Sequence, residues 1–233
     1  MMLTLMGFAH FMGLVLILEY ANAGCTPPNS GACIHGTDHV LTRFGLMEVR
    51  HAHVGNQILA VDEQGQLLWS PVTFHFHRPN DRQTLGLEIT LESGSKVTLT
   101  PEHQVFISSQ CRAEDLQHMD SISASEIREG MCLFRSQVGS EIGVIPEKVI
   151  AIRPKIMVGL YSPVTREGNL IVNNITVSSY SFMGHRRAHS LFSNYYNLSQ
   201  KKQKTVQNSF LEADLRNNGI YEWINGFGVD LSC

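Results

Sequence analysis

The feature that most restricts the fold of this chain is a series of short apolar runs, separated by turn residues, that begins at Val40. Apolar residues recur at every second position in several of these runs, as in strands with one buried face. The alternating runs 87–91 and 97–99 flank Ser93-Gly94-Ser95 and so predict a β-hairpin. No window sustains a helical period for more than about two turns. The pattern predicts an all-β fold.

The order of these runs repeats about 75 residues later. Segment 129–134 echoes 54–59, 149–153 echoes 72–78, and 167–172 echoes the hairpin at 93–99. Two copies are too few for a solenoid, which needs about three or more units. We therefore expect two related β subdomains within one medium-sized domain.

Residues 1–23 have the pattern of a secretory signal peptide. An apolar core at 11–18 is followed by Ala21-Asn22-Ala23, the small-x-small sequence that signal peptidase accepts. No Lys or Arg precedes the core, but a membrane anchor would need about 20 apolar residues, and only about half as many are continuous. We expect cleavage before Gly24, passage through the secretory pathway to the outside of the cell, and a short propeptide-like segment at 24–32.

Composition excludes some classes of partner. The formal charge of −3 gives no basic surface for nucleic acid. The strand pattern stops after Phe192, and the polar segment 193–233 carries a loose apolar group around 210–227. We expect a short, partly helical tail there and treat it as a candidate lipid-recognition region. The protein is expected to be a monomer.

The cysteine count is odd. Five cysteines are present (Cys25, Cys33, Cys111, Cys132 and Cys233), so at least one thiol of an exported chain stays outside intramolecular disulfides. Cys111 and Cys132 could form a disulfide, while Cys132 as a small buried apolar residue is an equal alternative. No C-x-x-C occurs, which excludes a zinc knuckle or a thioredoxin-like redox motif.

Cys33 and the sequence Thr100-Pro101-Glu102-His103 could together perform peptide-bond chemistry. A thiol at Cys33 can attack the carbonyl carbon of Ala32 and convert the amide into a thioester, if the leaving nitrogen is protonated. Imidazole donates protons near neutral pH, so His103 is the candidate acid, and the Thr100 hydroxyl could hold the scissile peptide. For an isolated Thr-x-x-His, a turn followed by a surface histidine is the more common structure.

Two other histidine pairs could suggest a metal site. His75 and His77 share one face of an expected strand, and so would His51 and His53. No third ligand is fixed by spacing, so we predict no metal and no cofactor.

Six motifs in order are similar to those of a known family. They are Cys33-Ile34-His35-Gly36, Ile58-Leu59-Ala60-Val61-Asp62, Gly65-Gln66-Leu67-Leu68-Trp69-Ser70, Leu99-Thr100-Pro101-Glu102-His103, a segment at 159–168 and Ser178-Ser179-Tyr180. Over 33–192 the chain resembles the Hint (Hog) autoprocessing domain of hedgehog and hedgehog-related (warthog- and groundhog-like) proteins. The resemblance implies the Hint fold, with two subdomains related by a pseudo-twofold axis, and Cys33 as nucleophile assisted by Thr100 and His103.

The resemblance also implies a second step, in which a sterol hydroxyl attacks the thioester and releases the upstream segment as an ester. The family's aspartate for this step is matched here by His77, which can also act as a base. Other departures are Ala32 in place of glycine before the nucleophile and Ser179 in place of a cysteine. We expect no signalling domain before Cys33 and therefore expect only residues 24–32 to be released.

Two functions therefore remain. The first is a self-cleaving, single-turnover enzyme whose substrate is its own N-terminal segment and whose acyl acceptor is a sterol, another membrane lipid or alcohol, or water. The second is a degenerate, non-cleaving extracellular module with a binding or structural role. Protein splicing is excluded, because it needs a terminal His-Asn and the chain contains none.

Overall fold

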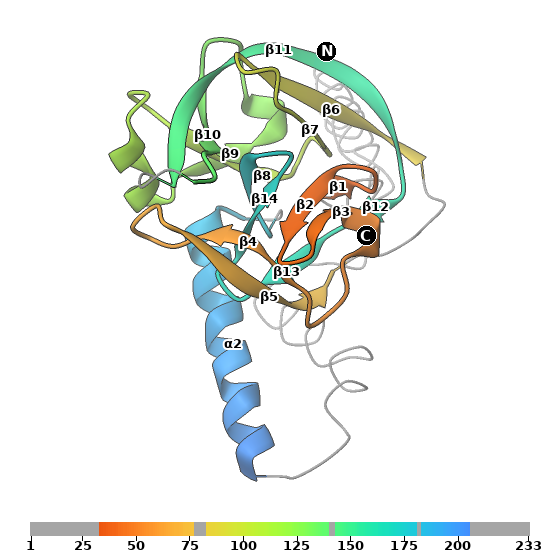
Figure 1. Cartoon of the computed structure of the whole chain (residues 1–233), viewed down its shortest axis with the longest axis vertical. Coiled ribbons are helices and arrows are strands. Elements are labelled where there is room, and N and C mark those ends of the chain that lie inside the picture. The colour runs from red at the N-terminus through yellow and green to blue at the C-terminus, as the bar shows by residue number, and fades with distance from the viewer. Residues whose placement is uncertain (1–32, 77–82, 140–142, 181–182, 206–233) are drawn as a thin grey trace, which may run out of the picture. The chain divides into compact units, whose positions relative to one another are not determined.

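The computed structural model describes residues 33–76, 83–139, 143–180 and 183–205 (Figure 1). All of them belong to one compact unit, Ser30–Asn208. The expected signal peptide, the segment 24–32 with Ala32, and His77 lie outside the described residues, as does the apolar group at 210–227.

Antiparallel strands are the main regular structure of the described chain, which confirms the predicted all-β fold. In chain order they are β1 (Ile34–His35), β2 (His39–Thr42), β3 (Gly45–Glu48), β4 (Gln57–Val61), β5 (Leu67–His75), β6 (Gln83–Leu91), β7 (Lys96–Leu99), β8 (Gln104–Ser108), β9 (Ser121–Ser123), β10 (Cys132–Ser136), β11 (Val144–Val158), β12 (Leu160–Tyr161), β13 (Pro163–Thr165), β14 (Asn169–Val172) and β15 (Ile175–Ser178). The helical elements are η1 (Val49–His51), η2 (Ala113–His118), η3 (Ala124–Glu126) and α2 (His185–Thr205).

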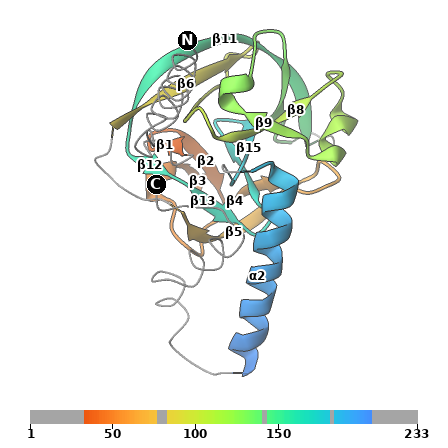
Figure 2. The same cartoon turned by 180° about the vertical axis from the view of Figure 1, so that it is seen from behind.

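The strand pairing contains the predicted duplication. Strands β5, β4 and β2 are hydrogen-bonded neighbours in that order, and β11, β10 and β8 repeat the arrangement in the second half. Each half also contributes a strand to the other half: β6 of the first half pairs with β11 of the second, and β13 of the second half pairs with β5 of the first. Both views show β6 and β11 side by side as a long ribbon (Figures 1 and 2). The two halves therefore cannot separate without breaking strand ladders.

Apolar side chains from both halves form one main core. Ile58, Ile89, Leu133 and Val149 are completely buried or nearly so, and they belong to the same cluster. Burial of an aliphatic side chain of this size contributes about 1.5–3 kcal/mol. The predicted alternation in the β6–β7 hairpin thus reflects one face packed on the core.

The polar segment after β8 contains two short helical turns. One of them is η3, which follows β9. The additional turn η2 packs Leu116 into a second apolar cluster. A disulfide joins Cys111 to Cys132 at the start of β10, so the disulfide alternative is confirmed. Cys132 is also buried, as the other alternative required.

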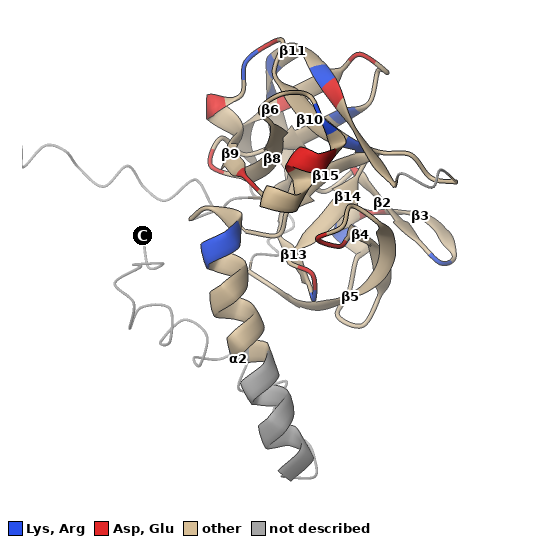
Figure 3. Ribbon diagram, turned by 90° about the vertical axis from the view of Figure 1, so that its left-hand side faces the viewer, with Lys and Arg blue, Asp and Glu red and all other residues tan. Residues whose placement is uncertain are grey.

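Helix α2 begins at His185, before the point where we expected the strand-rich domain to end. Its first turn carries the exposed residues Arg186 and Arg187, where Lys and Arg colouring appears in Figure 3. Its inward side buries Ala188 and Phe192. No helix within the described ranges is long and apolar enough to cross a membrane.

Loss of the disulfide should lower stability, since the bond closes a separation of 21 residues. The chain-entropy estimate for such a loop is about 3 kcal/mol. We expect Cys111→Ser alone to reduce the free energy of unfolding in urea by roughly this amount, because Cys111 is exposed and its replacement leaves the core untouched. If only the packing of Cys132 mattered, Cys111→Ser would be neutral and Cys132→Ala would be destabilising.

Candidate active site

Cys33 lies directly before β1, which is a two-residue strand held between two others. Ile34 pairs with Leu99 of β7 on one side and with Tyr161 of β12 on the other. The Cys33 side chain is completely buried and packs with Met157 and Leu160. A strand this short has little pairing of its own, so the neighbouring strands determine where the thiol lies.

The backbone of Cys33 is bonded to Thr100, the residue that follows β7. The Cys33 N–H donates to Thr100 Oγ1 at 2.9 Å, and the Thr100 N–H donates to the Cys33 carbonyl at 3.0 Å. Thr100 is completely buried. The nitrogen that Thr100 contacts belongs to the Ala32–Cys33 peptide bond, so the structure brings together the two residues that the sequence singled out.

His103 closes a turn with Thr100, but it is not a surface residue. Its N–H donates to the Thr100 carbonyl at 3.1 Å, and its side chain is 1% exposed. The alternative of a surface histidine is therefore wrong, although the expected turn is present. Its Nε2 lies 2.8 Å from the Ser178 carbonyl oxygen. Because a carbonyl only accepts, Nε2 carries a hydrogen, and Nδ1 is the ring atom that can exchange a second proton.

Ser178 connects His103 to a group of buried side chains. Its hydroxyl is 3.0 Å from His185 Nδ1 and accepts the Tyr180 N–H at 3.0 Å. The Tyr180 hydroxyl lies 3.2 Å from His189 Nδ1, and the rings of His185 and His189 stack. Ser178 and Tyr180 belong to one of the six motifs, but no role was predicted for either. His185 was not predicted at all, because nothing in the polar stretch around it indicates a buried helix face.

These groups remain uncharged near neutral pH. Burial, together with the neighbouring His189, lowers the pKa of His185 to about 3. Burial also lowers the pKa of His189 and raises the pKa of Tyr180. The carbonyl that holds His103 is thus supported by a neutral hydrogen-bonded network.

Ser179, which stands where the resembling family has a cysteine, makes structural contacts. Its N–H donates to the Gly168 carbonyl at 2.8 Å, and its hydroxyl oxygen accepts the Thr165 N–H at 3.4 Å. Ser179 therefore ties the end of β15 to the β13–β14 turn.

One cavity of about 720 Å³ lies against α2 and is lined by polar groups that include Asp62, Arg166 and His189. Neither Cys33 nor Thr100 nor His103 lines it. We therefore do not assign it to the peptide-bond chemistry.

Comparison with protein families decides the classification. The family model of the Hint module matches residues 21–231. The chain belongs to the Hint module family. The match covers most of the 233 residues, and the Hint fold accounts for the duplicated strand order.

Relatives of this Hint chain include hedgehog and warthog proteins. It is 26% identical to Warthog protein 8 of Caenorhabditis elegans over 176 residues, which cover 75% of this chain and 31% of that protein. It is 26% identical to Indian hedgehog protein of Xenopus laevis over 160 residues, with coverages of 68% and 38%. It is 28% identical to Sonic hedgehog protein of Danio rerio over 199 residues, with coverages of 82% and 47%. The chain thus spans less than half the length of each of these relatives.

Solved structures agree on the fold. The DnaB intein from Synechocystis sp. PCC 6803 is similar with a TM-score of 0.53 at 12% identity, covering 64% of this chain and 99% of that one. At this identity the likeness shows the fold alone, and it confirms the predicted Hint architecture.

His185 should make the Hint fold sensitive to acid. Its pKa is about 3 when folded, so below its ordinary value of 6.5 the unfolded chain binds a proton that the folded chain does not. Above pH 6.5 the His185 side chain is neutral in both states and does not lower the free energy of unfolding. As pH falls from 6.5 towards 3, the free energy of unfolding decreases. We expect His185→Asn to reduce the loss of unfolding free energy between pH 7 and pH 5 by about 2 kcal/mol.

The measurement is denaturant unfolding at both pH values, with His53→Asn at an exposed position as the control. Asp38, whose pKa is raised to about 6, acts in the opposite direction, but it does so in every variant and cancels in the comparison. An equal pH dependence in wild type and His185→Asn would contradict the expected role of burial.

Proposed function

We propose that this chain is a single-turnover, cis-acting autoprocessing domain. The Cys33 thiol gives up its proton and Sγ attacks the carbonyl carbon of Ala32. The bond from that carbon to the Cys33 nitrogen then breaks, the nitrogen takes up one proton and becomes a primary amine, and the acyl group has moved from nitrogen to sulfur. The observation that carries the proposal is the bond from the Cys33 N–H to Thr100 Oγ1, with the buried His103 in the same turn. The family membership and the hedgehog and warthog relatives support autoprocessing in general.

Thr100 is suited to the transition state of this step. Before the carbon–nitrogen bond breaks, the nitrogen of the tetrahedral intermediate takes up a proton and becomes positively charged. Its N–H groups are then charge-assisted donors, so the bond to Thr100 Oγ1 strengthens. An interaction that is stronger in the transition state than in the ground state lowers the barrier.

His103 is suited to deliver the proton. The Ser178 carbonyl fixes the ring by accepting from Nε2–H, so Nδ1 is the ring nitrogen that passes the proton to the leaving nitrogen in the proposed step. The side chain that contacts the Ser178 hydroxyl, His185, is neutral, so this network brings no charged group to the Ser178 carbonyl. His103 therefore acts as the general acid in the proposed step.

The thioester is then resolved by a sterol, another alcohol or water, with His77 as the candidate base and the tail 193–233 as the candidate lipid-recognition region. An alcohol acceptor is what the resemblance to hedgehog proteins implies. The Cys111–Cys132 disulfide supports folding in an oxidising compartment, in agreement with the proposed signal peptide at 1–23 and secretion. The domain at 33–192 acts as a monomer on its own N-terminal segment.

A non-cleaving module is the second candidate. It is favoured by Ser179, which occupies the expected thiol position and is committed to backbone contacts.

Intact-mass spectrometry of the purified chain tests the first step. We expect a species that begins at Cys33 and that increases on addition of a small thiol, since a thiol exchanges with the thioester. Cys33→Ala should abolish it. Thr100→Val keeps the shape but removes the acceptor for the Cys33 N–H, and we expect the rate to fall about ten- to a hundredfold.

Thr176→Val is the matched control. Thr176 is also completely buried, and its hydroxyl has no hydrogen-bond partner among the described residues, so the cleavage rate should not fall. Only full-length chain in the presence of thiol would overturn autoprocessing and leave the non-cleaving module.

The mass of the released N-terminal segment identifies the acceptor. A segment with a free carboxyl group indicates water, whereas one carrying an added sterol or other lipid mass indicates an alcohol. We expect His77→Ala to slow this release while thioester formation, measured with added thiol, continues. If His77→Ala instead slowed thioester formation and release equally, the assigned role in the second step would be wrong.

A further inference from the structure

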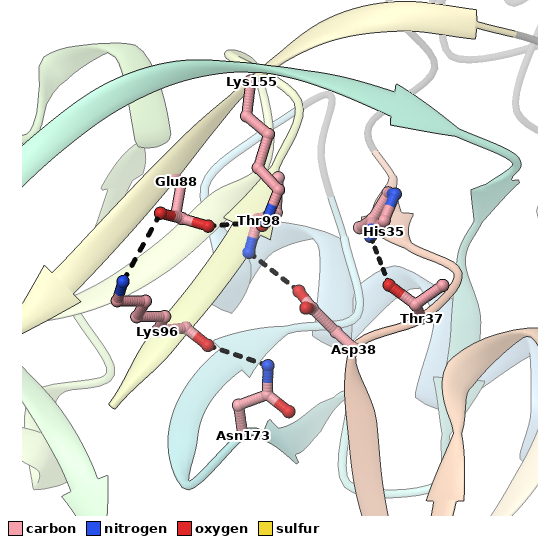
Figure 4. Close-up of polar contacts among 8 residues, drawn as sticks. All are labelled: His35, Thr37, Asp38, Glu88, Lys96, Thr98, Lys155 and Asn173. Atoms are coloured by element: carbon pink, nitrogen blue, oxygen red, sulfur yellow. Dashed lines mark hydrogen bonds and ion pairs between the residues drawn. The ribbon is translucent and has the colours of Figure 1, made fainter. Parts of the chain in front are cut away.

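Asp38 is a buried carboxylate just after the strand that follows the nucleophile. It is 8% exposed, and its N–H donates to the His35 carbonyl in the turn that ends β1. Glu147, the other buried acidic side chain of the described residues, forms an ion pair with Arg135. Asp38 instead points its carboxylate at backbone (Figure 4).

The Asp38 carboxylate accepts a hydrogen bond from β7 beyond the point where β1 stops pairing with that strand. Asp38 Oδ2 accepts the Thr98 N–H of β7 at 2.8 Å (Figure 4). The pair Ile34–Leu99 is the single register pair between β1 and β7, because the chain turns away after His35. Thr98 is 1% exposed, so its N–H needs an acceptor inside the protein, and the Asp38 side chain takes the place of a strand carbonyl.

The segment 33–38 is therefore bonded at both of its ends to residues at the end of β7. At one end the Cys33 N–H donates to Thr100, and at the other Asp38 accepts from Thr98. Thr98 and Thr100 lie two residues apart at the end of β7. If the contact at Asp38 is lost, this segment keeps the Ile34–Leu99 pair and the bonds between Cys33 and Thr100 on the β7 side, so the alignment of the Cys33 amide rests on fewer contacts.

Charged groups from several strands surround Asp38. Burial raises its pKa to about 6, while the Thr98 N–H, the Asn173 side chain, Lys155 and His39 favour its ionised form. Lys155 of β11 also binds Glu88 of β6, which in turn pairs with Lys96 of β7 (Figure 4). Above its pKa the carboxylate is charged, and its bond to Thr98 is charge-assisted.

We propose that Asp38 is a positioning residue for the acyl shift, which fixes the Cys33 amide on Thr100 by holding the turn after β1 against β7. This inference rests on the proposed autoprocessing function. It assigns Asp38 no contact with the reacting atoms.

Rates of thiol-induced cleavage in the full chain test the proposal. Asp38→Ala removes the acceptor and should slow cleavage at least about tenfold, whereas Asp38→Asn keeps an acceptor oxygen and should restore the rate to about one third of that of wild type at pH 7.5. Asp62→Ala is the matched control, because Asp62 Oδ1 also accepts backbone N–H groups, from Gln64 and Gln66, but in the β4–β5 turn. Its cleavage rate should stay near that of wild type.

The pH profile separates positioning from general stability. Only wild type titrates at position 38, so the ratio of the wild-type rate to the Asp38→Asn rate, measured on folded protein, should fall from about threefold towards one as pH drops through 6. His103 is present in both proteins, so its contribution to the rate cancels in the ratio. A ratio that stays constant would overturn the proposal, and so would equal rates for Asp38→Ala and wild type. This ratio also decides the matter if Asp38→Ala fails to fold.

Amide hydrogen exchange gives a readout that does not depend on cleavage. In the Cys33→Ala chain, which cannot react, adding Asp38→Ala should speed exchange at position 33 and at Thr98, while adding Asp62→Ala should not. Unchanged exchange would overturn the positioning role. If wild type does not cleave but the exchange result holds, the proposed function fails while the contact that positions residue 33 stands.

Discussion

The proposed chemistry depends on the hydrogen bond between the Cys33 N–H and Thr100 Oγ1. This bond joins residues that are 67 positions apart, and both side chains are completely buried. It exists because β1 lies between β7 and β12, so its backbone cannot shift without breaking pairs on both sides. Alignment that is built into the fold removes an entropy cost from the reaction, since the reacting groups are already held together.

The duplicated architecture explains why the site lies where it does. Thr100 and His103 belong to the connection between β7 and β8, where the first half of the chain passes into the second. Strand β15, at the end of the second half, pairs with β8 and so brings Ser178 to His103. The exchange of β6 and β13 between the halves locks this junction. The site is thus built from the beginning, middle and end of the domain.

The sequence predicted what depends on local pattern. Alternation identified the strands, the repeated order identified two halves, and the spacing of Thr100 and His103 identified a turn. Burial was harder to predict, because His103 and His185 are polar residues whose partners come from distant strands. Asp38 would be expected at the surface of a turn, and it is buried because Thr98 lacks a strand acceptor. The role of Asp38 follows from a backbone N–H that has no strand partner, and a sequence alone does not show which backbone groups lack partners.

The two proposed steps make different demands on the packing around Cys33. The acyl shift involves only groups of the chain itself, so a completely buried thiol is an advantage, because water is kept away from the thioester. Resolution of the thioester requires an external nucleophile to reach the same sulfur, which packs with Met157 and Leu160. Tight packing therefore favours formation of the intermediate and opposes its release. A thioester formed in this site would persist until an acyl acceptor gains access to it. Access to the buried sulfur, more than the chemistry of the thiol, would therefore determine whether water or an alcohol accepts the acyl group.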